Sequence, residues 1–96
     1  MAAVTRVGDP DIFHCSPMVR ATGNSTVKVN GRPASCQGDV NTPHLRPAGR
    51  NCKTHVGPIA LGSFTVKVGG RGIGRVGDKL VSCTRVAGGS NSVFAG

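Results

Sequence analysis

The stretch GNSTVKVNGRPASCQGDVNTPH at residues 23–44 returns 39 positions later as GSFTVKVGGRGIGRVGDKLVSC at residues 62–83. The two copies keep register without a gap, so that Asp39 falls on Asp78. Self-similarity at a fixed period is the signature of a structural unit that is used more than once. The chain is therefore organised around a repeated unit.

Each copy has the pattern of a β-hairpin. Val27 and Val29 alternate with polar residues, and a period of two predicts a half-buried strand with both valines on one face. Asn30–Gly31 follows in the first copy and Gly69–Gly70 in the second. These residue types supply the positive φ angles that a two-residue hairpin turn requires.

A third unit is split between the two ends of the chain. VTRVGD at residues 4–9 matches GRVGD at 74–78, and GGSNSVFAG at 88–96 resembles GSFTVKVG at 62–69. We therefore expect a single domain, residues 1–96, in which the last strand pairs with the first and three hairpin units form a pseudo-threefold ring. These units are residues 23–39, residues 62–78, and residues 89–96 together with 2–9.

The composition favours an all-β fold that needs help from something besides its core. A chain of 96 residues buries a modest share of its surface, and such chains often recruit a metal, disulfides or a partner. The 15 glycines and the recurring valines favour short strands joined by tight turns. The chain has no apolar run of about 18 residues, and its start lacks the features of a secretory signal. We expect synthesis in the cytoplasm, with any delivery elsewhere carried out by a machine.

The net charge of +8 arises because 12 Lys and Arg face four acids, all of them Asp. Such a balance raises the prospect of nucleic-acid binding. However, the basic residues are scattered singly, and the chain has no Tyr or Trp on which bases could stack. The charge pattern favours solvated faces and a surface that meets an acidic partner. A small basic zinc-binding protein that binds nucleic acid stays as the alternative.

The four cysteines are too far apart for a local metal motif. No CxxC pair occurs, which argues against a zinc ribbon. Without a secretory signal, free thiols are expected rather than a disulfide framework, and most of them should be small buried side chains. The cysteines are Cys15, Cys36, Cys52 and Cys83.

A Gly-Asp pair ends each unit, and its carboxylate is expected to cap nearby backbone N–H groups. These carboxylates are Asp9, Asp39 and Asp78, which leaves Asp11 as the one other acid. Five positions after each Gly-Asp pair comes a residue type that binds metals: His14, His44 and Cys83. A pseudo-threefold arrangement brings equivalent positions to a common distance from one axis. Three ligands could therefore converge on a single ion.

Zinc in a closed structural site takes four nitrogen or sulfur donors. The remaining histidine lies in the oversized middle connection, where RPAGRNCKTHVGP at residues 46–58 has the Pro and Gly content of an irregular loop. The sequence thus predicts structural zinc held by His14, His44, His55 and Cys83. Cys15 and Cys52 are the substitutes, each within three residues of a predicted ligand, whereas Cys36 is interpreted as structural.

A catalytic role is not favoured. A catalytic zinc usually keeps an open coordination position with a carboxylate base nearby, whereas four protein donors close the shell. The chain has no Glu, and Asp11 is its only unassigned acid. We therefore predict that the protein is not an enzyme, and a small metalloenzyme remains only as a competing class.

These residues resemble the PAAR-repeat family, whose members carry a Gly-Ser start, a Thr-Val-x-Val strand, an Asn-Gly-x-Pro-Ala turn and a Val-Gly-Asp exit followed by His or Cys. The matching elements are GNSTVKVNGRPAS, GSFTVKVGG, and RVGD at residues 6–9 and 75–78. The tetrapeptide that names the family is degraded to PASC at residues 33–36 and to GIGR at 72–75. The resemblance implies a small cone with a blunt base, and an apex stabilised by zinc from three His and one Cys.

The resemblance also implies a mechanical function. The protein would cap and sharpen the trimeric β-helical spike of a contractile injection machine, either a phage tail or a type VI secretion system. Its partner would be a VgrG-like or phage central spike, with one tip per trimer and transient contact with the target membrane. Some relatives carry fused toxin or adaptor domains. Since this chain ends at Gly96, any effector is expected to be a separate protein.

Overall fold

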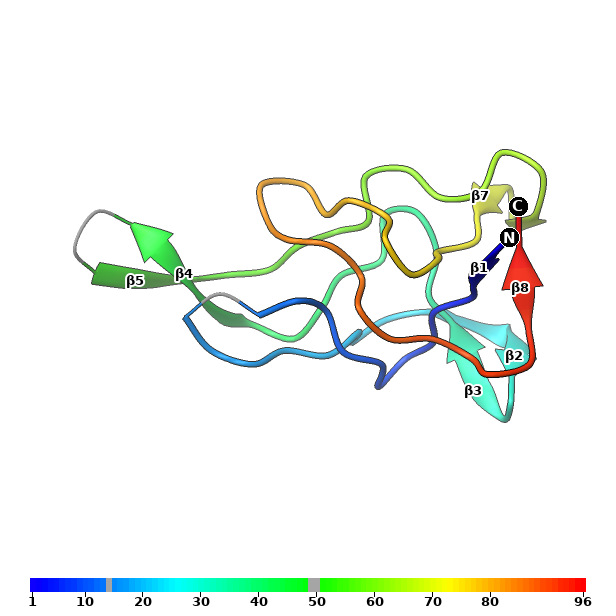
Figure 1. The fold of residues 1–96 in the computed structure, drawn as a ribbon, viewed down its shortest axis with the longest axis horizontal. Helices are drawn as coiled ribbons and strands as arrows, with labels where there is room; N and C mark the ends of the chain where they lie inside the picture. Colours follow the sequence, from blue (N-terminus) through cyan, green and yellow to red (C-terminus); the bar gives the residue numbers. More distant parts are fainter. Residues whose placement is uncertain (14, 49–50) are drawn as a thin grey trace.

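Eight short strands run through the part of the chain that the computed structural model describes, residues 1–13, 15–48 and 51–96. No helix occurs among these residues, and hence none long and apolar enough to span a membrane. The predicted all-β class is confirmed. The molecule measures 40 × 23 × 21 Å, with most strands gathered at a blunt end and one ladder projecting at the other (Figure 1).

The strands pair in four antiparallel two-stranded ladders. Three lie at the blunt end, and we call them the base ladders: β1 (Ala2–Ala3) with β8 (Phe94–Ala95), β2 (Asn24–Val29) with β3 (Arg32–Ala34), and β6 (Lys67–Val68) with β7 (Arg71–Gly72). The fourth, the tip ladder, joins β4 (His44–Ala48) to β5 (Asn51–His55). Because β1 pairs with β8, the two ends of the chain lie side by side at the blunt end (Figure 1).

The base ladders share one register. The corresponding opposite pairs are Val29 with Arg32, Val68 with Arg71, and Ala95 with Ala2. In the first two ladders a tight turn joins the pair, whereas in the third the two chain ends take the place of the turn. The same small structure is therefore built three times, once from segments at opposite ends of the sequence.

The two closed base ladders turn at the predicted residues. Asn30 and Gly31 have φ angles of 54° and 80°, and Gly69 and Gly70 have φ angles of 59° and 80°. Two successive positive φ angles match the right-handed twist of the flanking strands. Asn tolerates this backbone region better than other residues with a side chain. The prediction of two-residue turns is confirmed.

The predicted alternation of β2 is only partly correct. Val29 is buried, as are its counterparts Val68 and Ala95, but Val27 is 38% exposed. The reason is a register shift between Asn24 and Lys28, which takes the residues between them out of the ladder. Valines at the counterpart positions of Val27 are exposed to the same degree, Val66 at 39% and Val93 at 37%.

A closed ring of three backbone hydrogen bonds joins the units in the interior. The amide of Thr5 donates to the carbonyl of Gly74 at 3.0 Å, that of Gly74 to Ser35 at 2.9 Å, and that of Ser35 to Thr5 at 3.2 Å. All three residues are buried. The ring pairs buried backbone N–H and C=O groups that lie outside the ladders. It therefore joins three distant segments of the chain to one another.

Each Gly-Asp turn is capped by its own carboxylate, as predicted. The backbone amide three residues earlier donates to the Asp oxygen in every unit: Arg6 to Asp9 at 2.9 Å, Cys36 to Asp39 at 2.7 Å, and Arg75 to Asp78 at 2.8 Å. The preceding glycines, Gly8, Gly38 and Gly77, have φ angles of 93°, 88° and 93°. Glycine adopts this conformation at little steric cost.

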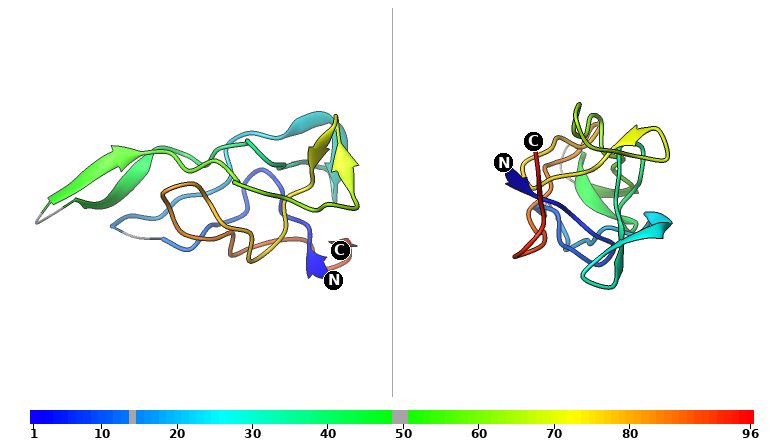
Figure 2. Two further views of the ribbon diagram at one scale, coloured as in Figure 1. Left: turned by 90° about the horizontal axis from the view of Figure 1, so that it is seen from above. Right: turned by 90° about the vertical axis from the view of Figure 1, so that its right-hand side faces the viewer.

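The prediction of an irregular loop at residues 46–58 is wrong, because most of this segment belongs to the tip ladder (Figure 2). Pro and Gly usually indicate a loop, but a proline fits an edge strand whose N–H is not needed for pairing. Both strands of a two-stranded ladder are edges, and Pro47 lies opposite Cys52. The same register places His44 opposite His55.

Candidate metal centre

Three of the predicted ligands meet where the tip ladder joins the body of the molecule. The Cys83 Sγ atom lies 3.3 Å from His44 Nε2 and 3.5 Å from His55 Nε2. One donor atom from each residue lies within 4.8 Å of the others. Tetrahedral zinc with bond lengths of about 2.3 Å to sulfur and about 2.0 Å to nitrogen separates such donors by about 3.6 Å. The group therefore fits a single metal ion.

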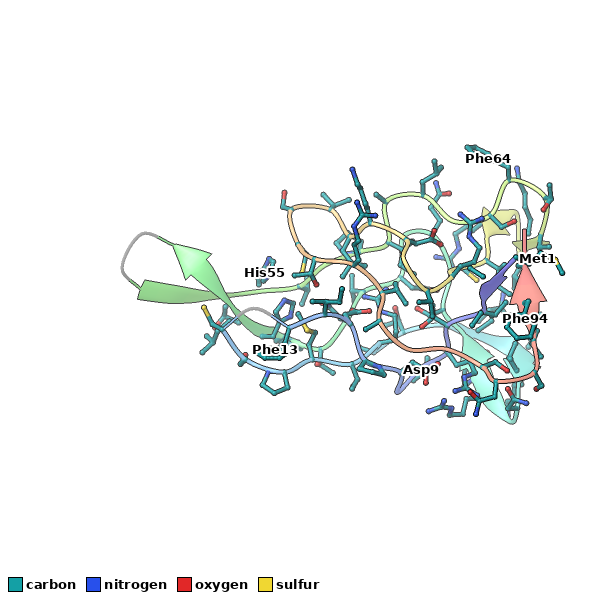
Figure 3. The ribbon with its side chains drawn as sticks, viewed as in Figure 1. Met1, Asp9, Phe13, His55, Phe64 and Phe94 are labelled. Carbon is teal, nitrogen blue, oxygen red and sulfur yellow. The ribbon has the colours of Figure 1, made fainter. Side chains whose placement is uncertain are left out.

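The tip ladder explains why the two histidines converge. His44 and His55 form its opposite pair nearest the body, and their rings lie edge to face with centroids 4.3 Å apart. Figure 3 shows His55 at the root of the projecting ladder, far from the blunt end with Met1 and Phe94. Two imidazoles thus reach one point from neighbouring strands.

The protonation pattern of His44 suits a ligand. Its Nδ1 atom lies 2.9 Å from the carbonyl oxygen of Thr42, which can only accept a hydrogen bond. Nδ1 therefore donates this hydrogen bond, which leaves Nε2, the atom that faces Cys83, as the nitrogen available to bind a metal. The His44 side chain is buried, so the contact with Thr42 fixes its ring in this orientation.

Cys83 is presented by a tight turn. Its amide donates to the carbonyl of Leu80 at 3.4 Å, and Ser82 between them has a positive φ of 51°. Gly57 packs directly against the cysteine, because a Cβ atom at position 57 would lie 2.9 Å from the Cys83 Sγ atom. No sequence pattern points to Gly57, since its role depends on the close approach of a segment far away in the chain.

The structure brings His44, His55 and Cys83 together. The fourth predicted ligand, His14, lies outside the described residues. The expectation of free thiols is wrong for Cys15, which is disulfide-bonded and so does not serve as a substitute ligand. The side chain of the other substitute, Cys52, lies outside the described part of the chain.

Cys36 has the environment of a structural thiol. It is fully buried in the core cluster at the base, and its Sγ atom lies 3.7 Å from the carbonyl of Ala34. Burial, together with the nearby Asp39 carboxylate, raises the pKa of the Cys36 thiol above its ordinary value. A raised pKa keeps the thiol protonated, which disfavours metal binding.

Comparisons with known proteins agree with this arrangement. A sequence model described as the PAAR motif matches residues 50–96, a range that contains His55, Cys83 and the base ladder of β6 and β7. No curated protein matches the chain. The region before residue 50 carries the same strand, turn and Gly-Asp exit, as the repeat shows. The chain belongs to the PAAR-repeat proteins, which as a class form the spike tips of contractile injection systems.

Proposed function

We propose that this protein caps and sharpens the trimeric β-helical spike of a contractile injection machine, with one tip on each trimer. The observation that carries the proposal is the threefold repetition of the blunt end. Val27, Val66 and Val93 are exposed to within two percentage points of one another; Val27 lies within β2, and Val66 and Val93 directly precede β6 and β8. A monomer with three similar surfaces can meet three identical subunits of a partner.

The blunt end has the apolar character of a surface that is covered in an assembly. Phe64 is 75% exposed, and Phe94 and Met1 are also exposed at the same end of the molecule (Figure 3). Soluble proteins rarely expose several large apolar side chains in one region unless a partner covers them. The end of a spike trimer would supply that cover.

Unpaired strand edges at the blunt end support the same partner. In each base ladder one strand, β1, β3 or β7, accepts a backbone hydrogen bond from the neighbouring unit on its outer edge. The other strand, β2, β6 or β8, has no further strand beside it within the described residues. Free edges invite pairing with further strands, and proteins usually cover them. A β-helical spike also ends in strands with unpaired backbone groups, so that each partner would cover the open strand edges of the other.

At the opposite end we propose a structural zinc ion bound by His14, His44, His55 and Cys83. The facing donors of the last three residues support it. A closed shell of this kind would supply stability rather than catalysis, and it would hold the tip ladder on the body. The elongated outline, 40 Å by about half that width, suits a point that is pushed through a membrane. We therefore place the protein at the tip of a phage tail or of a type VI secretion spike.

Mixing the protein with a trimeric fragment of the spike from the same system tests the proposal. We expect one chain per trimer by light scattering after gel filtration. Val66→Asp should weaken the complex because it places a charge in the apolar contact. Val19→Asp is the matched control, since Val19 is 37% exposed but neither belongs to a base ladder nor adjoins one in the chain. Failure of the wild type to associate, together with salt-sensitive binding to DNA, would instead favour a nucleic-acid-binding protein.

A further inference from the structure

A layer of buried residues lies between the Gly-Asp turns and the metal centre, and it is apolar on one side and polar on the other. Three positions in this layer are equivalent, because the backbone amide of each donates to an Asp carbonyl: Arg20 to Asp9 at 2.8 Å, Ile59 to Asp39 at 3.0 Å, and Val86 to Asp78 at 3.0 Å. Three partner positions bridge to them: Asn41 to Arg20, Leu80 to Ile59, and Asp11 to Val86.

Half of this layer is apolar and half is polar. Ile59, Leu80 and Val86 form a hydrophobic cluster. The remaining members, which we call the polar sector, are Arg20, Asp11 and Asn41, all buried, with Arg20 fully inaccessible to solvent. Burying a charged pair costs desolvation energy, and well-packed apolar residues are often at least as stable in such places. Stability alone therefore does not explain why one sector is polar.

Arg20 and Asp11 form an ion pair that is anchored on both sides. Arg20 Nη2 lies 3.1 Å from Asp11 Oδ2, and both side chains are fully buried. The guanidinium also donates to two backbone carbonyls, Asp39 at 3.1 Å and Gly57 at 2.8 Å. These contacts fix the guanidinium in place, and it gives the Asp11 carboxylate a neutralising charge.

The pair determines how the Asn41 side chain is oriented. Asn41 Nδ2 donates to Asp11 Oδ2 at 2.9 Å, and Asn41 Oδ1 accepts from the amide of Gly57 at 2.6 Å. A carboxylate only accepts and a backbone N–H only donates, so the amide has one allowed orientation. In this orientation Nδ2 also lies 4.0 Å from the Cys83 Sγ atom.

Asn41 therefore touches or adjoins every ligand segment that the structure describes. It precedes His44 by three residues, it binds Gly57 two residues after His55, and it donates toward the sulfur of Cys83. Residues that orient metal ligands by hydrogen bonds typically change metal affinity about 10- to 100-fold when they are replaced.

We propose that Asn41 is a positioning residue of the metal centre. Its amide donates a hydrogen bond to the Cys83 thiolate, and the Arg20–Asp11 pair holds the amide in that orientation. The inference deepens the metal site proposed above and rests on it. It explains the polar sector as the support of one sulfur ligand, because the apolar members of the layer have no side-chain hydrogen-bond donor.

Cobalt(II) titration of the full-length protein tests the proposal, because the thiolate-to-metal charge-transfer band reports on the sulfur itself. Asn41→Leu places in this sector the residue type found at Leu80. We expect about 10- to 100-fold weaker cobalt binding. We also expect the band to move to lower energy, since a hydrogen bond to sulfur stabilises the donor electrons. Thr22→Val is the control, because it removes a hydroxyl that binds Asp39 rather than the cysteine. It should change neither quantity.

A second variant separates positioning from folding. Asp11→Leu, Arg20→Ile and Asn41→Leu together make the layer apolar all round, and such replacements often keep or raise stability. We expect the triple variant to fold and to show the same weakened binding and shifted band. Wild-type affinity and band energy in this variant would overturn the role of Asn41. Absence of cobalt binding by the wild type would overturn the metal centre itself, whereas binding to the spike trimer tests the tip function independently.

Discussion

The guanidinium of Arg32 on β3 lies 2.6 Å from the carboxylate of Asp9, which belongs to a different repeat of the fold. The equivalent contact joins Arg71 to Asp39 at 3.4 Å. Asp78 pairs with Arg75 of its own turn, and the position that corresponds to Arg32 and Arg71 is occupied by Ala2. The base ladder built from the two chain ends thus lacks the arginine that forms an ion pair with the neighbouring repeat.

Ala2→Arg should restore this missing contact. The new guanidinium would approach Asp78 beside Gly77, where no side chain lies near the glycine, as Arg32 does beside Gly8. Partly exposed ion pairs contribute about 0.2–1 kcal/mol, so we expect a gain of this size in the free energy of unfolding at low salt. Urea denaturation measures it. Ala2→Gln is the control, and an equal gain from the uncharged variant would show that the effect is not electrostatic.

The Asp9 carboxylate should make the free energy of unfolding depend on pH. Burial opposes its ionisation, but hydrogen bonds from Arg6 and Arg32 outweigh burial and hold the pKa of Asp9 below its ordinary value of about 3.9. A lowered pKa means that the contribution is complete above pH 4 and is lost as the pH falls through the folded-state pKa. We expect Asp9→Asn to lower the urea midpoint at pH 7.

The same substitution should matter less in acid. Below the unfolded-state pKa the wild type begins to lose the contribution of the charged carboxylate, so the difference between the two proteins should shrink as the pH falls further. A difference that stays constant from pH 7 to pH 2 would show that the charge of Asp9 contributes little. The cap itself survives in the variant, because the Asn oxygen can still accept from the amide of Arg6.

Gly74→Ala should disrupt the ring of backbone hydrogen bonds. A Cβ atom at this position would lie 2.5 Å from the carbonyl oxygen of Ser35 and 2.6 Å from Ile59 Cδ1. Because the first neighbour is backbone, the ring itself must shift, and overpacking of this kind costs about 1–3 kcal/mol or more. Thermal unfolding measures the loss.

A contrasting glycine separates crowding from backbone strain. Gly70 has a φ of 80° but open space around its Cβ position. Gly70→Ala should therefore cost only the left-handed conformation, about 1–2 kcal/mol. If Gly70→Ala destabilised the protein more than Gly74→Ala, the ring would not be the tighter constraint.

Sequence predicted best what depends on neighbouring residues. The turn at Asn30 and the cap of Asp39 follow from local rules, because each requires a specific residue type within a few positions. The convergence of His44 with Cys83 was also predictable, since the repeat relates distant positions. Sequence did not predict the tip ladder, because Pro47 is a loop signal that an edge strand tolerates.

The polar sector of the buried layer could not be predicted from the sequence, for a different reason. In the sequence Arg20 is one of twelve scattered basic residues, and such residues are usually solvated. Only the fold shows that it is buried at a position where the other units have apolar residues. Gly57 and Asn41 likewise depend on which segment packs against them. Such contacts join residues far apart in the chain, and no local pattern records them.

Metal removal should weaken the whole molecule. Protein purified without chelator is expected to contain one zinc per chain by elemental analysis, and a strong chelator should lower its melting temperature substantially. Structural zinc contributes of order 10 kcal/mol in small domains at neutral pH. Because the ligands must be deprotonated, the stabilisation should also fall as the pH is lowered.

Single substitutions then identify the ligands. His55→Ala should lose most of the bound zinc, and His14→Ala should do the same if this residue completes the shell. Cys36→Ala is the matched control, because this thiol is buried in the base cluster rather than at the metal centre. It should retain one zinc per chain even where it reduces stability. Retention of zinc by His14→Ala would show that another group supplies the fourth donor, whereas metal-free wild-type protein would rule out the centre altogether.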